Sequence, residues 1–236
     1  MINQFTRTNI LLGEERIRQL SEQHILIAGL GGVGGYVAEA IVRAGIGKVT
    51  IIDHDVVDIT NINRQLIATL DNVGKPKASE FEARIKLINP EVNLCVRQEF
   101  IVEDNLEQLL ADRPDYVIDC IDTVNSKLAL LIHCIKNKIQ VISSMGAGNR
   151  IDVSKAKIAD ISQTKVCALA RNIRLRLREC GIKKGLKVVY SEEEPFNKPV
   201  KNPEGGRPIN GTISYLPALF GIMLAGKAIK DLIGEK

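Results

Sequence analysis

A glycine-rich segment directly follows a short apolar stretch near the start of the chain. The apolar stretch covers residues 24–28, and Gly29-Leu30-Gly31-Gly32-Val33-Gly34 comes next. Glycines have no Cβ, so the backbone can approach a phosphate closely, and the helix that follows offers unpaired N–H groups to negative charge. We expect a nucleotide phosphate to bind here, with Gly29, Gly31, Gly32 and Gly34 forming the loop.

An acidic residue lies about 20 positions beyond the glycines, which is the spacing at which such folds bind a ribose. This residue is Asp53, and it ends a second apolar stretch. The glycines and Asp53 alone favour an ordinary NAD-binding fold.

Two cations and a further carboxylate change that interpretation. Arg64 carries a fork that suits phosphate oxygens, and Lys77 stands at the start of an expected helix. Asp122 follows an expected strand that ends at Asp119, and a carboxylate there can hold magnesium. Each residue alone would usually be a surface charge, but together they indicate a nucleoside triphosphate positioned for chemistry at phosphorus.

An alternation of strand and helix patterns would place these residues at one edge of a sheet. After a leading helix over 14–20, we expect strands at 24–29, 48–53, 92–97, 115–119 and 139–144. Between them we expect helices at 33–45, 76–88, 103–110 and 125–137. This order predicts an α/β, Rossmann-like, doubly wound fold with a mostly parallel sheet, and ligands bind at the carboxyl ends of such strands.

A C-terminal extension is expected over 149–236, following a nucleotide-binding core over 1–148 within a single domain over 1–236. It should contain a strand at 156–161, a basic helix at 165–180, a strand at 186–190, a long loop over 192–208 and a helix at 212–233. The basic helix either contacts nucleic-acid phosphates or is a solvated face, and both interpretations stay open for its arginines, which are Arg171, Arg174, Arg176 and Arg178.

The composition excludes several other classes of protein. The 236 residues are 45% apolar and carry a net charge of +4, which allows one substantial core and permits contact with nucleic acid. The five cysteines form no Cys-x-x-Cys pair, so we expect neither a disulfide scaffold nor structural zinc. The apolar run at 213–225 is short and contains Pro217, so we expect a buried helix, no stable membrane insertion and a cytoplasmic location.

The remaining reactive side chains carry little signal. Cys167, near the basic helix, is read as a half-buried structural thiol rather than a thiol acceptor, because no histidine or metal motif accompanies it. Cys120 lies between two aspartates, where a thiolate is disfavoured. The three histidines, His24, His54 and His133, have no metal-ligand spacing.

The joint pattern resembles the ThiF, MoeB and ubiquitin-activating-enzyme superfamily of ATP-dependent adenylyltransferases. The matching segments are Gly29-x-Gly-Gly-x-Gly34, Asp53-x-Asp55, Asn61-x-x-Arg64-Gln65, Lys77 and Asp119-x-x-Asp122. The resemblance implies ATP and Mg²⁺ as cofactors, with ribose at Asp53 and magnesium at Asp122. It implies a nucleotide site that includes Asn61, Arg64, Gln65 and Lys77. It also implies a homodimer in which Arg7 reaches the partner's ATP, so that Arg7, Arg64, Lys77 and Asp122 would be catalytic.

Within that superfamily, the chain resembles the tRNA threonylcarbamoyladenosine dehydratases. The segments that carry this resemblance are 7–13, 160–164, 188–193 and 210–217, and the two Cys-x-x-Cys pairs of the carrier-activating branch are missing. The resemblance implies ATP-dependent cyclisation of N6-threonylcarbamoyladenosine, next to the anticodon of tRNA, through activation of the threonyl carboxylate. Activation, positioning and charge neutralisation can suffice for this reaction without a protein nucleophile.

Two other hypotheses remain at this point. The chain would otherwise activate the C-terminus of a ubiquitin-like sulfur-carrier protein, or it would be a nucleotide-binding module without catalysis. Whether AMP or ADP is released, and whether a monovalent cation binds, also stays open. So does a sulfur-transfer partner, because Asn210 lies in the region where some dehydratases have a cysteine.

Overall fold

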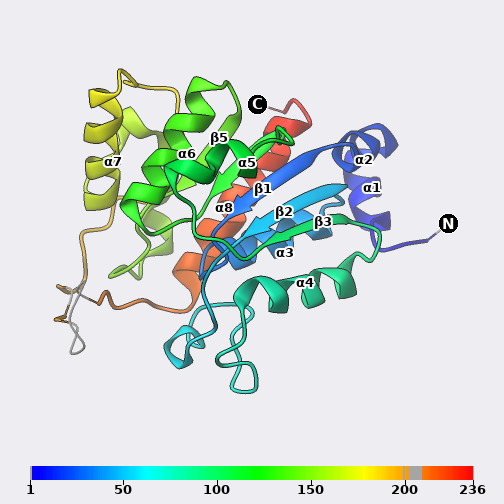
Figure 1. Cartoon of the computed structure of the whole chain (residues 1–236), viewed down its shortest axis with the longest axis horizontal. Helices are drawn as coiled ribbons and strands as arrows, with labels where there is room; N and C mark the ends of the chain where they lie inside the picture. The colour runs from blue at the N-terminus through cyan, green and yellow to red at the C-terminus, as the bar shows by residue number, and fades with distance from the viewer. Residues whose placement is uncertain (1, 199, 202–208, 236) are drawn as a thin grey trace.

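One seven-stranded sheet runs through the computed structural model, which describes residues 2–198, 200–201 and 209–235 (Figure 1). The strand order is β3-β2-β1-β4-β5-β7-β6. All neighbouring strands are parallel except β6, which runs antiparallel to β7 at one edge. The strands are β1 (His24–Ala28), β2 (Lys48–Ile52), β3 (Asn93–Arg97), β4 (Tyr116–Asp119), β5 (Gln140–Ser144), β6 (Ala156–Asp160) and β7 (Lys187–Ser191).

Helices cover both faces of this sheet, so the prediction of a doubly wound α/β fold is confirmed. One face packs against α2 (Glu14–Ser21), α3 (Gly34–Arg43), α4 (Lys77–Ile88) and α8 (Tyr215–Leu232). The other face packs against α5 (Leu106–Leu109), α6 (Val124–Lys136) and α7 (Ala168–Glu179).

The central strand β1 shows why the sequence folds in this way. All five of its residues are buried. Ile25 and Ile27 belong to the core on the α3 and α8 face, whereas Leu26 and Ala28 belong to the core on the α5 and α6 face. Strands buried on both faces are continuously apolar rather than alternating.

The strand order creates a crevice next to β1. The chain runs from β1 outward to β2 and β3, and then returns to the other side of β1 with β4 and β5. Ligands bind at the carboxyl ends of the strands at such a switch point. Gly34 allows α3 to start close to β1, because a Cβ at this position would lie 1.7 Å from the carbonyl oxygen of Gly29.

Residues 149–236 add β6, β7, α7 and α8 to the same sheet and core. Helix α8 packs directly on α3, since a Cβ at Gly221 would lie 2.5 Å from the carbonyl oxygen of Val33. Of the loop expected over 192–208, residues 192–198 contain no helix or strand, and residues 199 and 202–208 lie outside the described residues. No helix within the described ranges is long and apolar enough to cross a membrane.

An additional helix and a late helix start are the main differences from the sequence prediction. An additional helix, α1 (Thr6–Leu12), precedes α2, and it contains none of the buried residues that would have marked it in the sequence. The basic helix begins at Ala168 rather than at 165. Val166 adopts a φ of +63°, and the N–H of Cys167 donates to the carbonyl of Lys165 at 2.6 Å, so the chain makes a tight turn before the helix.

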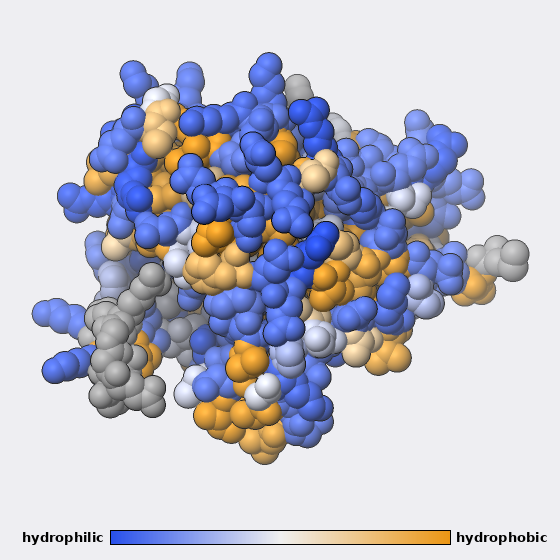
Figure 2. All heavy atoms as spheres, in the orientation of Figure 1, coloured by the Kyte–Doolittle hydropathy of each residue, from blue (hydrophilic) through white to orange (hydrophobic). Residues whose placement is uncertain are grey.

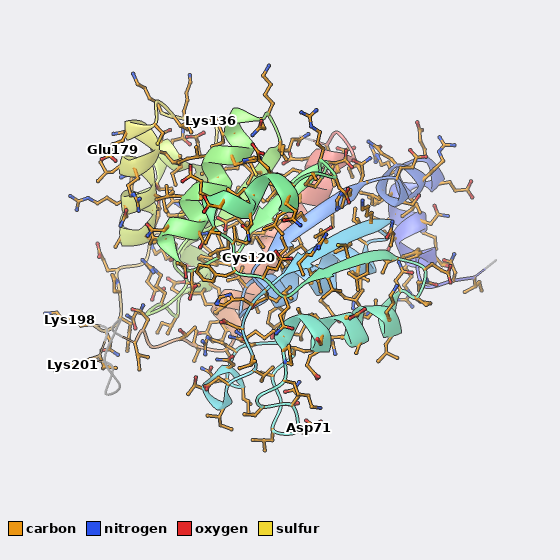
Figure 3. The ribbon with its side chains drawn as sticks, viewed as in Figure 1. Asp71, Cys120, Lys136, Glu179, Lys198 and Lys201 are labelled. Atoms are coloured by element: carbon orange, nitrogen blue, oxygen red, sulfur yellow. The ribbon has the colours of Figure 1, made fainter. Side chains whose placement is uncertain are left out.

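The surface is mostly hydrophilic in the view of Figure 2, with apolar side chains gathered at the bottom. These lie over the loop between β2 and α4, where Ile59, Leu70 and Val73 are exposed. Figure 3 shows Cys120 in the middle of the molecule, whereas Lys198 and Lys201 project from its lower left.

Candidate functional site

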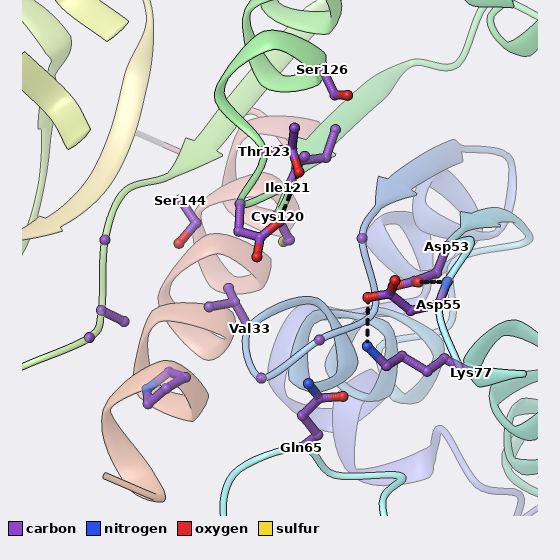
Figure 4. Close-up of a pocket in the computed structure, with 18 of the residues that line it drawn as sticks. Val33, Asp53, Asp55, Gln65, Lys77, Cys120, Ile121, Thr123, Ser126 and Ser144 are labelled. Carbon is purple, nitrogen blue, oxygen red and sulfur yellow. Dashed lines mark hydrogen bonds and ion pairs between the residues drawn. The ribbon is translucent and has the colours of Figure 1, made fainter. Parts of the chain in front are cut away.

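A cavity of about 640 Å³ opens at the carboxyl ends of β1, β2, β4 and β5 (Figure 4). Most of the residues selected from the sequence line it, namely Gly29, Gly31, Gly32, Asp53, Arg64, Gln65, Lys77 and Asp122. Gly34, Asn61 and Arg7 are not among its lining residues. The cavity therefore brings together side chains that are far apart in the sequence.

The glycine loop meets three other segments of the chain at one side of the cavity. A Cβ at Gly32 would lie 3.3 Å from Cγ of Arg64 and 3.2 Å from Cβ of Pro217, which lies in the first turn of α8. A Cβ at Gly31 would lie 3.7 Å from Nε2 of Gln65. A side chain at Gly32 would thus press against Arg64 and Pro217, so this position favours glycine.

Asp53 is buried and held in place by the backbone. Its Oδ2 accepts the N–H of Leu30 at 2.6 Å, and its Oδ1 accepts the N–H of Asp55 at 2.8 Å. Burial raises the pKa of the Asp53 carboxyl, while the two backbone donors and the charge of Lys77 oppose this rise. The carboxylate is fixed at the end of β2, between the glycine loop and the start of α4.

Arg64 is oriented by the turn that precedes it. Its Nη1 donates to the carbonyl of Thr60 at 2.8 Å and to Oδ1 of Asn63 at 2.9 Å. Burial lowers the pKa of the guanidinium, and the negative charges of Asp122 and Asp58 oppose this effect. Asp122 is itself exposed on the cavity side of the loop after β4.

Asn61 holds the backbone of Arg64 through a hydrogen bond. It ends a short 3₁₀ helix, Ile59–Asn61, where its Oδ1 accepts the N–H of Asp58 at 3.2 Å and its carbonyl accepts the N–H of Arg64 at 3.0 Å. The structure therefore does not bring Asn61 to the cavity wall, where a direct phosphate contact was expected.

Lys77 and Gln65 are buried at the cavity. Nζ of Lys77 forms an ion pair with Oδ2 of Asp55 at 2.9 Å, and Lys77 begins α4 as predicted. Oε1 of Gln65 is buried without a hydrogen-bond partner among the described residues. Such an orphaned oxygen in a cavity wall is an unmet acceptor that a ligand donor can satisfy.

His54 lies between Asp53 and Asp55 in the sequence and also lines the cavity, although the sequence analysis assigned it no role as a metal ligand. Ligand atoms of Asp53, His54 and Asp55 all lie within 4.8 Å of one another. Both oxygens of Asp53 accept backbone N–H groups, and Asp55 is paired with Lys77, so the two carboxylates already have partners.

A buried ion pair under the β4–β5 edge was not found from the sequence. Nζ of Lys127 lies 2.6 Å from Oδ2 of Asp119, and both side chains are completely buried. Ser143 Oγ donates to the same carboxylate oxygen at 2.5 Å, and Asp119 Oδ1 accepts the N–H of Ile121 at 3.0 Å. The two aspartates of the Asp119-x-x-Asp122 motif are thus separated, because Asp119 is internal and only Asp122 faces the cavity.

The cysteines are free thiols. All five lie within the described residues and are unpaired. Burial and the neighbouring Asp119 raise the pKa of the Cys120 thiol, in agreement with the expected disfavoured thiolate. Cys167 is buried rather than half-buried, precedes α7 and does not line the cavity.

Arg7 lies away from the cavity. It is exposed on α1, and Phe5, just before that helix, packs near Gly45 beyond the end of α3. Gly45 lies just before β2, so that end of α3 is at the amino ends of the strands, whereas the cavity lies at their carboxyl ends. Within one chain, Arg7 therefore does not reach the site.

The end of β5 supplies a wall that sequence reasoning missed. Met145, Gly146, Ala147 and Gly148 line the cavity. Behind them, Nη1 of the buried Arg150 donates to the carbonyls of Gly146 and Gly148 at 3.0 and 3.1 Å. The cluster of three small residues, Gly146-Ala147-Gly148, followed by a basic residue, was the available signal.

Charge is divided unevenly between the two parts of the chain. Residues 1–148 hold 15 Lys and Arg against 19 Asp and Glu, a net charge of −4. Residues 149–236 hold 17 against nine, a net charge of +8. Among the arginines of α7, Arg171 and Arg178 are exposed, whereas Arg174 donates to the carbonyl of Thr164 at 3.0 Å and Arg176 donates to Oδ1 of Asn125 at 2.9 Å.

A Rossmann-like sheet with a glycine loop, a fixed carboxylate and two cations at its crevice defines a nucleotide-binding α/β protein. The model of the ThiF family matches residues 5–236. The chain belongs to the ThiF family.

Relatives match over nearly the whole chain. The tRNA threonylcarbamoyladenosine dehydratase of Bacillus subtilis is 39% identical, over 100% of this chain and 96% of the relative. Crystal structures of E. coli tRNA N6-threonylcarbamoyladenosine dehydratase with AMP and with ATP superpose with TM-scores of 0.91 and 0.89. Both are 36% identical and cover 98% of this chain and 94% of theirs. The E. coli sulfur carrier protein ThiS adenylyltransferase is 28% identical over only 56% of this chain and 52% of its own.

Proposed function

We propose that this protein is an ATP-dependent tRNA threonylcarbamoyladenosine dehydratase. The observation that carries the proposal is the full-length match to dehydratases, which includes the part of the cavity built by residues beyond 148. The carrier-activating relatives are less similar: the E. coli ThiS adenylyltransferase is 28% identical over 56% of the chain, and a probable molybdopterin-synthase adenylyltransferase of Porphyra purpurea is 27% identical over 96% of it. We treat 1–148 as the nucleotide-binding core and 149–236 as the substrate-side extension of one domain.

The cavity supports ATP rather than NAD as the nucleotide. Asp53 would hold the ribose hydroxyls, and the backbone at Gly31 and Gly32 would approach the phosphates. Arg64 and Lys77 supply the two cations that a triphosphate needs. ATP is bound in the similar E. coli structure. Gln65, with its unmet acceptor, would receive a ligand donor, and Asn61 would act by positioning Arg64.

Magnesium fits the exposed carboxylate of Asp122. Thr123 Oγ1 lies 3.4 Å from Oδ1 of Asp122, a long contact that leaves the carboxylate open to a metal ion. Magnesium is commonly held by one or two carboxylates together with substrate phosphates, where it neutralises phosphate charge. Asp122 would therefore be its only protein ligand at this edge, near the guanidinium of Arg64.

The reaction follows from the placement of these groups. A threonyl carboxylate oxygen attacks a phosphorus atom of ATP, and the bond to the leaving phosphate group breaks. A nitrogen of the carbamoyl unit then attacks the acyl carbon and closes a five-membered ring, while the original carboxylate oxygen leaves on the phosphoryl group. Arg64 and Lys77 neutralise charge throughout, so no protein nucleophile is needed, in keeping with the raised pKa of Cys120.

We propose tRNA and a second copy of this chain as partners, from the net charge of residues 149–236 and from the position of Arg7. The net charge of +8 on residues 149–236 suits tRNA, with Arg171 and Arg178 available on α7. Arg7 could act at an ATP site only in a second copy, so we propose a homodimer. An enzyme with this substrate would work in the cytoplasm. A monovalent-cation site and a sulfur-transfer partner remain further hypotheses within the proposal.

Mass spectrometry of tRNA nucleosides tests the proposed function. Incubation with ATP and magnesium should convert the threonylcarbamoyl nucleoside into a product lighter by one water. The matched control is Asp122→Ala, which removes the exposed carboxylate and should give no conversion. Unchanged tRNA, together with ATP–pyrophosphate exchange that requires a carrier protein with a Gly-Gly tail, would replace this proposal with the carrier-activating one.

A further inference from the structure

In the loop that follows β5, a buried arginine binds two backbone carbonyls, and none of these groups was assigned to the nucleotide above. Gly146, Ala147 and Gly148 line the cavity, whereas Arg150 does not. Arg150 is 6% exposed, and its Nη1 holds the carbonyl oxygens of Gly146 and Gly148 from outside the cavity. The loop is therefore fixed with two of its carbonyls turned toward a buried cation.

The direction of one N–H group follows from these hydrogen bonds. In a trans peptide the carbonyl oxygen and the next N–H point to opposite sides. The Gly146 carbonyl points to Arg150, so the N–H of Ala147 points away from Arg150 and toward the cavity. Among the described residues, the N–H groups of Gly146, Ala147 and Gly148 have no acceptor. Of these three residues only Ala147 is buried, and its unpaired N–H can donate to a ligand acceptor in the cavity.

The charge at the loop favours an anionic ligand. The guanidinium of Arg150 donates only to carbonyls, including that of Glu193 at 3.1 Å, and forms no ion pair with any carboxylate in the described part of the chain. The nearby Glu193 carboxylate instead accepts the N–H groups of Ile151 and Asp152. Backbone N–H groups in a turn can form an anion-binding concavity.

The place of the loop in the strand order identifies which anion it would bind. Along the sheet edge the order is β2, β1, β4, β5, so Asp53, the glycine loop, Asp122 and residues 146–148 follow one another. Neighbouring strands are about 4.8 Å apart, so the loop lies about 10 Å beyond the phosphate loop. Figure 4 shows Ser144, next to the loop, at the opposite side of the pocket from Lys77. This is where an acyl group bonded to the reacting phosphate would lie.

We propose that the N–H group of Ala147 binds the substrate carboxylate and stabilises its oxygen during ring closure. This inference rests on the proposed function. When the carbamoyl nitrogen bonds to the acyl carbon, the carbonyl electron pair moves onto the acyl oxygen, which this N–H group holds. The pair returns as the carbon–oxygen bond to the phosphoryl group breaks, and the nitrogen releases its proton to solvent. Arg150 is a positioning residue, because it orients the loop without touching substrate.

An amide-to-ester exchange at Ala147 tests the donor directly. Replacing Ala147 by its α-hydroxy acid removes the N–H and also makes the Gly146 carbonyl a weaker acceptor for Arg150, an effect that the Arg150 variants measure separately. Loss of one such donor lowers kcat about 10²- to 10³-fold. We expect this fall with an unchanged dissociation constant for ATP. The matched control is the same exchange at Ala111, which is exposed and does not line the cavity, and should leave kcat unchanged.

Arg150 provides an independent test that does not need ester chemistry. Arg150→Met should lower kcat with little effect on the KM for ATP, and Arg150→Lys should restore part of kcat, because a cation again faces the carbonyls. Urea unfolding of both variants measures their stability. If kcat follows stability rather than the presence of a cation, Arg150 has only a structural role.

The outcomes separate this inference from the proposed function. An inactive wild-type enzyme on modified tRNA would overturn the proposed function itself. An active wild type whose kcat survives the ester at Ala147 would overturn only the carboxylate site. Equal losses of ATP binding and kcat in the ester variant would also overturn it, because the N–H would then serve the nucleotide.

Discussion

Replacing Lys127 with methionine should destabilise the fold strongly. Lys127 and Asp119 are both completely buried, and their charged atoms lie 2.6 Å apart. Methionine has a similar length but no charge, so Asp119 would keep a buried carboxylate that is bound only by Ser143 Oγ and the N–H of Ile121. Lys127 also donates to the carbonyl of Ser144 at 3.1 Å, which would lose this partner.

The expected cost follows from the burial of this pair. Removing one partner of a buried ion pair costs about 3–5 kcal/mol, because the other charge remains without compensation. For a chain of this size each kcal/mol shifts the melting temperature by about 2–4 °C, so we expect a fall of roughly 6–20 °C. Removing both charges in the double variant Asp119→Asn/Lys127→Met should recover part of the loss.

Urea unfolding followed by circular dichroism measures this effect. The midpoint should fall at an unchanged m-value for Lys127→Met and lie higher in the double variant. Nucleotide binding should weaken in the single variant, because Asp119 also anchors the backbone leading to Asp122. A loss below about 1 kcal/mol, or a double variant less stable than Lys127→Met, would refute the reasoning.

Four other changes give contrasting results. Arg64→Ala should weaken ATP binding more than Arg64→Lys, because the lysine keeps the charge and loses only the fork; equal calorimetric losses would contradict this. Gly34→Ala should abolish folding or ATP binding, since its Cβ would lie 1.7 Å from the Gly29 carbonyl, and a soluble variant that binds ATP normally would disprove the clash. Cys167→Ser should keep most dehydratase activity; a dead variant of normal stability would instead point to a thiol mechanism. Charge reversal at the exposed Arg171 or Arg178 should weaken tRNA binding and reduce its salt dependence, whereas reversal at Arg174 should lower stability because this side chain holds Thr164.

The mostly parallel sheet and the helices on both of its faces could be predicted because each element depends on a local pattern, whereas the order of the strands in the sheet was not predicted. The apolar runs, the glycines at 29–34 and Pro76 before α4 each determine a nearby element. Arg64 and Lys77 could be placed at the cavity because both follow β2 on its carboxyl side. The separation of Asp119 from Asp122 could not, because it depends on Lys127, a cation buried between α6 and the sheet.

Residues that act through the backbone were the hardest to find. Asn61 fits the family motif, but its place behind Arg64 depends on how the 3₁₀ turn closes. Arg150 looks like an ordinary surface cation in the sequence, and only tertiary structure turns it toward the carbonyls of residues 146 and 148. The late start of α7 depends on the positive φ of Val166, which residue type does not predict.

The uneven charge gives the molecule an electric dipole moment. Residues 1–148, with a net charge of −4, and residues 149–236, with a net charge of +8, contribute strands to the same sheet. The two charges therefore do not belong to separate domains that could move apart. Near a polyanion, the torque on this dipole would turn the α7 side forward before contact and the acidic side away. The protein would then meet the polyanion with the cavity mouth near α7 already directed toward it. Added salt would weaken this orientation, because it shortens the Debye length.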